Sequence, residues 1–174
     1  MSRFLYPSEY YSSTYKINFA RYYQMGYRAL LFDIDNTLVP HNAMTDERSR
    51  RLLTDLRRMG FSICFISNNK EPRVNRFVKE LHVEGLPDPS YVYKAGKPKR
   101  TGYLNGLRKM RIPIRRALFI GDQLFTDIWG ANRAGIRSIL VKQIDKKEEI
   151  QIVLKRILER PILFFYRRRH PIRA

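Results

Sequence analysis

The sequence is poor in cysteine, in acidic residues and in long hydrophobic runs. Its 174 residues include one cysteine, Cys64, which excludes a disulfide framework or a cysteine-rich zinc site and is typical of a reducing compartment. No apolar run approaches the ~18–20 residues of a membrane-spanning helix, and the N-terminal segment lacks the apolar core of a signal peptide. We therefore expect a cytoplasmic protein.

Acidic residues are outnumbered two to one by basic residues. The chain has 34 Lys and Arg against 16 Asp and Glu, a formal net charge of +18, yet 44% of its residues are hydrophobic. That hydrophobic content excludes a disordered polyelectrolyte, and the length fits a single domain. A strongly basic surface attracts polyanions, which here means nucleic acid, anionic lipid or phosphorylated substrates.

Short apolar runs, rich in Ile, Phe, Val and Leu and without polar alternation, recur along the chain. This pattern is typical of strands that are covered on both faces of a sheet. Stretches with helical features separate the runs, and such alternation implies a parallel sheet between two helical layers. We therefore predict a Rossmann-like, three-layer α/β fold with about five core strands, at residues 29–32, 61–66, 91–93, 117–120 and 138–141.

The predicted helices carry start and stop signals. Segments 46–59 and 125–134 are each followed by a glycine, which commonly ends a helix. Segments 72–81 and 98–110 each begin with a proline, which suits the first helical turn.

Two flanks depart from this rhythm. The first is rich in tyrosine and is predicted to hold a short helix at 17–25. The second begins with a predicted helix at 147–159, which Pro161 is expected to end. Its apolar stripe has helical spacing and consists of Ile150, Val153, Leu154, Ile157 and Leu158. The predicted parts of the chain are an N-terminal extension at 1–27, a core domain at 28–160 and a basic aromatic tail at 161–174.

Polar side chains follow four of the predicted strands. Open α/β sheets bind ligands at the carboxyl ends of their strands, so we expect these side chains to converge. Four carboxylates so close would repel one another and have raised pKa values unless a cation neutralised them, and oxygen ligands suit Mg²⁺. The converging residues are Asp33, Asp35 and Thr37, then Ser67, Asn68 and Asn69, then Lys97, and finally Asp122 and Asp127.

These residues form four motifs that occur in a fixed order. The motifs are D-x-D-x-T at 33–37, S-N at 67–68, G-K-P at 96–98 and G-D-x-x-x-T-D at 121–127. Together they resemble the haloacid dehalogenase (HAD) superfamily of phosphatases and phosphotransferases. In that superfamily dehalogenases lack an acid at the position of Asp35 and transport ATPases have threonine there. The resemblance therefore implies a phosphatase or phosphomutase.

The resemblance also implies a role for each motif residue. Asp33 would be the nucleophile that forms an aspartyl-phosphate, and Asp35 the general acid and base. Mg²⁺ would be bound by Asp33, the backbone carbonyl of Asp35, and Asp122. Ser67, Asn68 and Lys97 would bind phosphoryl oxygens, Asp127 would assist the metal through water, and Thr37 would orient the first loop. For Asn68, merely ending the strand is the alternative.

The segments between the motifs leave no room for a large cap domain. Those between residues 39 and 60 and between 69 and 97 each hold one helix and a loop at most. An open site suits a phosphate on a bulky carrier, such as a protein, a nucleic acid or a lipid headgroup. The strings LLFDIDNTLVP, ISNN and GDQLFTDIWGANRAG most resemble the subfamily IIIA phosphatases of the YqeG type. Relatives in that group dephosphorylate phosphatidylglycerophosphate, which is thus the favoured substrate.

Alternatives to this function remain open. One is a nucleic-acid or ribosome-associated basic protein with a secondary HAD site, and another is a protein or nucleotide phosphatase. The aromatic and arginine-rich tail fits a solvated face, peripheral attachment to an anionic membrane or, with less support, nucleic-acid binding. The oligomeric state is left open.

Overall fold

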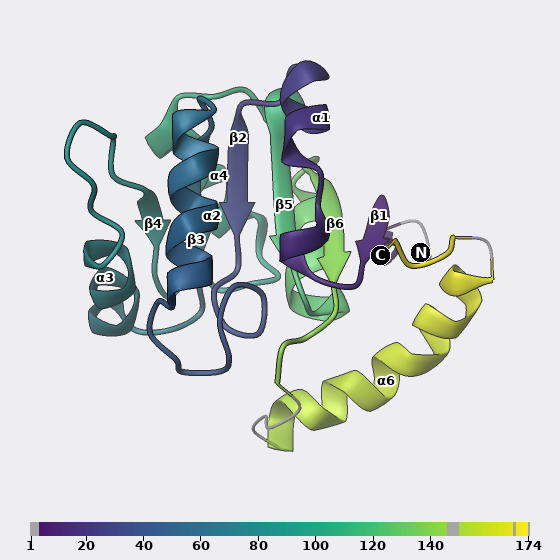
Figure 1. Ribbon diagram of the computed structural model, residues 1–174. Coiled ribbons are helices and arrows are strands. Elements are labelled where there is room, and N and C mark those ends of the chain that lie inside the picture. The colour runs from purple at the N-terminus through teal and green to yellow at the C-terminus, as the bar shows by residue number, and fades with distance from the viewer. Residues whose placement is uncertain (1–3, 146–149, 169, 174) are drawn as a thin grey trace.

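The computed structural model describes residues 4–145, 150–168 and 170–173, and its centre is a parallel sheet (Figure 1). The strand order is β1-β6-β5-β2-β3-β4. The strands are β1 (Glu9–Tyr11), β2 (Ala29–Phe32), β3 (Ser62–Ile66), β4 (Ser90–Val92), β5 (Ala117–Gly121) and β6 (Arg137–Val141). The predicted Rossmann-like α/β fold is confirmed. Its five predicted core strands are β2 to β6, and β1 is a sixth strand at the edge.

Helices cover both faces of the sheet. Side chains alternate along each strand, so Leu30 and Phe32 of β2 join one core cluster while Ala29 and Leu31 join the other. The first layer contains α1 (Phe19–Gln24), α2 (Glu47–Arg58) and α3 (Glu71–Lys79), and the second contains α4 (Arg100–Met110) and α5 (Trp129–Arg133). Short helical turns are η2 (Thr14–Lys16), η3 (Ile114–Arg116) and the π-helical η4 (Leu124–Ile128).

The helix boundaries follow the signals in the sequence. Asp46 caps α2 by accepting a hydrogen bond from the Ser49 backbone, while the Ser49 hydroxyl accepts one from the Asp46 backbone. Gly60, with a φ of 98°, then turns the chain into β3. The helix predicted at 125–134 is present as η4 followed by α5, and the short helix predicted at 17–25 is α1. Between β2 and β4 the described chain holds only α2, β3, α3 and their loops, with no inserted domain.

Both flanks of the chain are fastened to the edge of the sheet. β1 pairs with β6, with Tyr10 opposite Leu140. The C-terminal segment joins the same edge, because the Arg173 backbone donates to the carbonyl of Tyr10 at 2.8 Å and accepts from Ser12 at 2.9 Å. The predicted N-terminal extension therefore contributes a strand to the fold.

A buried ionic group, which we call the Glu9 cluster, holds this edge together. The Glu9 carboxylate accepts hydrogen bonds from Tyr22 Oη at 2.6 Å and Arg137 Nη2 at 3.0 Å, and it pairs with Arg173 Nη1 at 2.6 Å. Burial works to raise the pKa of Glu9, but the bonds from Tyr22 and Arg137 and the charge of Arg173 lower it overall. The carboxylate is therefore fully compensated by the protein itself.

The last helix, α6 (Ile150–Arg167), corrects one prediction. Pro161 lies inside α6, so the prediction that it ends the helix is wrong, and the predicted boundary after residue 160 falls within one helix. Tyr166 is 2% exposed, and Ile162 and Leu163 pack against the core. This packing beyond the proline offsets the lost backbone hydrogen bond.

Parts of the predicted C-terminal elements lie outside the described residues. These parts are positions 147–149 of the predicted helix, the side chain of Ile150, and Arg169 of the tail. Within the residues that the structure does describe, none of the helices is long and apolar enough to cross a membrane.

Candidate active site

Four neighbouring strands, β5, β2, β3 and β4, bring the motif residues together at their carboxyl ends. β2 lies between β3 and β5 in parallel register, with Phe32 opposite both Phe65 and Ile120. Because parallel strands end on the same side, the residues that follow them are close together. A cavity of about 140 Å³ opens there, lined by Asp33, Asp35, His41, Ser67, Asn68, Asn69, Lys97, Gln123 and Thr126.

A group of buried carboxylates, which we call the acidic cluster, lies at the carboxyl ends of these strands. Carboxylate oxygens of Asp33, Asp122 and Asp127 all lie within 4.8 Å of one another. Lys97 Nζ is 2.7 Å from Asp33 Oδ1 and 2.7 Å from Asp127 Oδ1. All four side chains are buried, so their charges interact with little screening by solvent.

The negative and positive charges of the acidic cluster do not cancel. Burial raises the pKa of Asp33 well above its ordinary value; Lys97 lowers it in part, while Asp127 and Asp122 raise it further. Burial alone would lower the pKa of Lys97, but the charges of Asp127 and Asp33 raise it overall. The lysine thus stays protonated, and its single positive charge does not compensate three carboxylates.

The donor set of the acidic cluster fits a divalent cation. When all groups are charged, three carboxylates and one ammonium leave a net charge of minus two. Hard cations prefer carboxylate oxygens, and a divalent ion supplies the missing charge. Asp33 and Asp122, both predicted as metal ligands, are in the cluster. Asp127, predicted to assist the metal through water, also has a carboxylate oxygen in the cluster.

Asp127 also shapes the loop that carries Asp122. Its Oδ2 accepts hydrogen bonds from the backbone N–H groups of Asp122 at 3.1 Å and Gln123 at 3.0 Å. The loop passes so close that a Cβ on Gly121 would be 2.6 Å from the Asp127 Cβ. The glycine of the G-D motif is therefore required for this close approach of side chain to backbone.

Asp35 lies at the cavity wall, with its side chain held apart from the acidic cluster. Its Oδ1 accepts hydrogen bonds from Asn42 N at 2.7 Å and Arg73 Nη2 at 3.2 Å, and its Oδ2 accepts one from Asn69 Nδ2 at 2.6 Å. A carboxyl beside the cluster but outside it is the arrangement that proton transfer needs. Arg73, on α3, belongs to none of the four motifs, and sequence reasoning missed it.

The loops after β3 and β4 are joined by Asn68. Its Oδ1 accepts from the Lys97 N–H at 2.8 Å and its Nδ2 donates to the Lys97 carbonyl at 3.3 Å. Asn68 therefore sets the backbone position from which Lys97 reaches the acidic cluster. Ser67 lies beside it, is 2% exposed, and its hydroxyl accepts from the Asn69 N–H at 3.1 Å.

Thr37 bridges two motifs. Its hydroxyl donates to Asp122 Oδ1 at 3.3 Å, and its carbonyl accepts from Thr14 Oγ1 at 2.6 Å. The threonine of the first motif thus contacts the aspartate of the last one. Its sequence position gave no sign of this contact, because 85 residues separate the pair.

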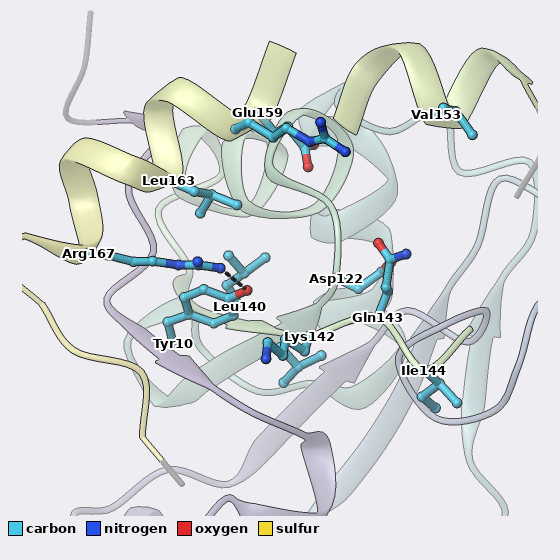
Figure 2. A pocket seen from close by; sticks show the side chains of 12 residues that line it. Tyr10, Asp122, Leu140, Lys142, Gln143, Ile144, Val153, Glu159, Leu163 and Arg167 are labelled. Atoms are coloured by element: carbon cyan, nitrogen blue, oxygen red, sulfur yellow. Dashed lines mark hydrogen bonds between the residues drawn. The ribbon is translucent and has the colours of Figure 1, made fainter. Parts of the chain in front are cut away.

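A second, larger cavity lies between α6 and the carboxyl end of β6 (Figure 2). Its volume is about 540 Å³, and Asp122 of the acidic cluster forms part of its wall. Leu163 and Arg167 project from α6 toward Leu140 and Tyr10, and Arg167 Nη2 donates to Tyr10 Oη at 3.1 Å. Lys142 and Arg160 also line this cavity, so cationic side chains lie next to the acidic cluster.

Comparisons with known proteins agree with this geometry. The family model described as HAD-hydrolase-like matches residues 94–152, which hold the G-K-P and G-D motifs. The motif residues at the carboxyl ends of a parallel α/β sheet and the family match agree on the class: the chain is similar to the HAD-like hydrolases, and these findings together indicate a phosphatase.

Particular relatives can be named. The chain is 29% identical over 170 residues to the "Probable phosphatase YqeG" of Bacillus subtilis, covering 97% of this chain and 95% of that one. The predicted resemblance to YqeG-type phosphatases is thereby confirmed. An uncharacterized protein from Corynebacterium glutamicum shares the fold, with a TM-score of 0.50, 19% identity and coverage of 76% and 93%. A HAD phosphatase from Thermococcus onnurineus aligns with a TM-score of 0.49, 13% identity and coverage of 75% and 97%.

Proposed function

We propose that the protein hydrolyses a phosphomonoester, with Mg²⁺ as cofactor and Asp33 as the nucleophile, and that its substrate is phosphatidylglycerophosphate. The observation that carries the mechanism is the buried acidic cluster, in which the carboxylates of Asp33, Asp122 and Asp127 lie together and one lysine, Lys97, pairs with Asp33 and Asp127. A bound Mg²⁺ would supply the positive charge that lets an anionic carboxylate approach an anionic phosphate.

The residues of the chain then divide the chemistry between them. Asp33 attacks phosphorus, so that a P–O bond to its carboxylate forms as the bond to the leaving oxygen breaks. Asp35 gives a proton to that leaving oxygen and later takes one from the water that hydrolyses the aspartyl-phosphate. Lys97 and Ser67 line the cavity and would bind the phosphoryl oxygens, where charge is spread in the transition state.

The arrangement of Asp35 supports its proposed role. Hydrogen bonds from Arg73, Asn42 and Asn69 fix both carboxylate oxygens of Asp35. A fixed carboxyl loses little entropy on reaching the reactive geometry. Arg73 is thus a positioning residue for the proton transfer.

The shape and charge of the site support a phosphate on a large, anionic carrier. The cavity of about 140 Å³ admits a phosphoryl group and few further atoms, so the carrier would lie outside it. Next to it, Lys142, Arg160 and Arg167 line the cavity of about 540 Å³ that reaches Asp122. These cations would suit the second, diester phosphate of phosphatidylglycerophosphate.

Phosphate release from phosphatidylglycerophosphate in mixed micelles tests the proposal. With Mg²⁺ the wild-type chain should release phosphate, and excess EDTA should stop the release. Asp33→Asn should lose at least about 10³-fold in kcat. Asp55→Asn, on the exposed face of α2, is the matched control and should retain the wild-type rate.

Two results would contradict different parts of the proposal. Turnover that survives Asp33→Asn would exclude Asp33 as the nucleophile. A preference for a phosphoprotein or a nucleoside monophosphate in the same assay, by kcat/KM, would exclude the lipid as the substrate and leave the mechanism intact.

A further inference from the structure

Helix α6 carries an apolar face that the protein leaves uncovered. Of the twelve large hydrophobic side chains that are exposed in the described chain, half belong to this one helix. The six, which we call the α6 stripe, are Val153 (41% exposed), Leu154 (58%), Ile157 (50%), Leu158 (63%), Phe164 (55%) and Phe165 (59%). This includes four of the five residues whose spacing predicted an apolar stripe.

Most of the α6 stripe lies opposite the face that packs on the body; Val153, at its edge, also lines the cavity under α6. At about 100° per residue, the six residues occupy an arc of roughly 140° that runs along most of the helix. The opposite face is covered, since Tyr166 and Glu159 are both 2% exposed and Leu163 packs against the core. An outward apolar face on a helix anchored along its other side is typical of helices that lie in a membrane interface.

Among the described residues of α6 and of the segment that follows it, the charges beside the α6 stripe have one sign. Glu159, the acidic residue of α6, is turned inward, where its Oε1 accepts a hydrogen bond from Phe125 N at 3.2 Å. Arg160, Arg167 and Arg168 are exposed, and Arg168 lies over the Phe164 ring at 4.8 Å. A surface complementary to this stripe therefore has an apolar layer beneath a negatively charged one.

We propose that the α6 stripe docks the protein on an anionic lipid membrane, with α6 lying in the plane of the headgroups. The charge of the chain, +18, favours anionic lipid over the other apolar partner at hand, a second copy of this chain. Two copies joined through their α6 stripes would bring Arg168 of each, which lies over the Phe164 ring, and two strongly basic chains against like charge, which opposes association.

Docking through α6 would also present the active site to the membrane. Figure 1 shows α6 on the side of the sheet toward which the strands point, next to β6 and β1. The cavity under α6 reaches Asp122, so the acidic cluster lies close to the docked helix. The docking does not rest on the proposed substrate, because the stripe would bind lipid whichever phosphate ester the site hydrolyses.

Flotation with lipid vesicles tests the docking without any turnover. The full chain is mixed, at about 150 mM salt, with vesicles of phosphatidylcholine alone or with phosphatidylglycerol added. The test variant is Leu154→Glu/Leu158→Glu. The matched control is Met25→Glu/Met59→Glu, which places two charges on exposed hydrophobic residues (51% and 36% exposed). These residues precede β2 and β3 and so lie toward the amino ends of the strands, whereas α6 lies toward the carboxyl ends (Figure 1). Far-UV circular dichroism melts check that both variants are folded.

Wild-type and control proteins should float with the anionic vesicles, and the test variant should lose at least about tenfold in partitioning. A wild type that ignores anionic vesicles would overturn the proposal, as would a folded test variant that binds as well as wild type. A dimer in sedimentation equilibrium that Leu154→Glu/Leu158→Glu dissociates would assign the stripe to a second copy instead. RNA binding is measured at the same salt concentration. A wild-type protein that binds RNA and does not bind the vesicles would exclude a lipid membrane as the partner of the α6 stripe.

Discussion

Two buried charge clusters lie in the same sheet, and they differ in how their charge is compensated. In the Glu9 cluster one carboxylate is surrounded by Tyr22, Arg137 and Arg173, and its pKa is lowered. In the acidic cluster three carboxylates lie together with one cation, Lys97, which pairs with two of them, and the pKa of Asp33 is raised. The first cluster stabilises the fold with protein groups alone. The second leaves a charge that only a ligand can balance.

The difference indicates where stability and function lie. Uncompensated buried charge costs stability, and proteins retain it where catalysis requires it. The edge formed by β1 and β6 is not part of the candidate active site, and there Arg137 and Arg173 contact the buried acid Glu9. Substitutions in the two clusters should therefore have opposite effects on activity and on the free energy of unfolding.

Removing one cation from each cluster should give the largest difference in kcat between two variants. Lys97→Met takes away the group that contacts Asp33 and Asp127 and is placed to bind the phosphoryl group, so kcat should fall by about 10²–10³-fold. Arg137→Met should leave kcat within about twofold, because its side chain contacts Glu9 and Tyr27 and none of the residues of the acidic cluster. Steady-state hydrolysis of p-nitrophenyl phosphate with Mg²⁺ measures both. Equal losses in the two variants would show that the acidic cluster has no special catalytic role.

Removing a carboxylate from each cluster should change stability with opposite sign. Glu9→Gln leaves the partly exposed Arg137 and Arg173 without their counter-charge and should lower the free energy of unfolding by about 1–2 kcal/mol. Asp33→Asn relieves repulsion among buried carboxylates and should raise that free energy, in metal-free protein, by about 0.5–2 kcal/mol. Urea unfolding in EDTA at pH 7 compares them. A destabilised Asp33→Asn protein would show that Lys97 already balances the acidic cluster.

The pH dependence of these two effects follows from the directions of the pKa shifts. A lowered folded-state pKa means that the contribution of Glu9 is present above the unfolded pKa, about 4.3, and is lost as pH falls through the lower folded value. The raised pKa of Asp33 has the reverse sign, so its contribution is lost as pH rises above about 3.9. The difference in free energy of unfolding between wild type and Glu9→Gln should become smaller below about pH 4. The increase in that free energy caused by Asp33→Asn should become larger from about pH 4 to 7.

Local signals in the sequence were sufficient for most of the fold. The apolar runs coincide with β2 to β6 within one residue at either end, and Asp46, Gly60 and Gly135 mark helix ends as their types predict. The strand β1 has only three residues, and its place was not predicted because it depends on pairing with distant residues of β6. The continuation of α6 through Pro161 likewise depends on the packing of Tyr166.

The candidate site was predictable in its residues more than in its contacts. Because the motif aspartates follow buried strands, their convergence could be inferred from the order of the chain. The contact of Arg73 with Asp35 could not, since α3 presents several basic residues and nothing in the sequence distinguishes this one. The exposure of the α6 stripe was hidden for a similar reason: periodicity shows that a helix has an apolar face but not what covers it.

The effect of Mg²⁺ on thermal unfolding tests the central claim, that the acidic cluster holds a charge which a divalent cation balances. At about 100 times its Kd, Mg²⁺ should stabilise the metal-free wild-type protein by about 2.7 kcal/mol, which raises Tm by about 5–10 °C. Glu9→Gln should melt lower but show the same rise, and Asp122→Asn should show little or none. A wild-type Tm that Mg²⁺ leaves unchanged, or an equal rise in Asp122→Asn, would contradict the account.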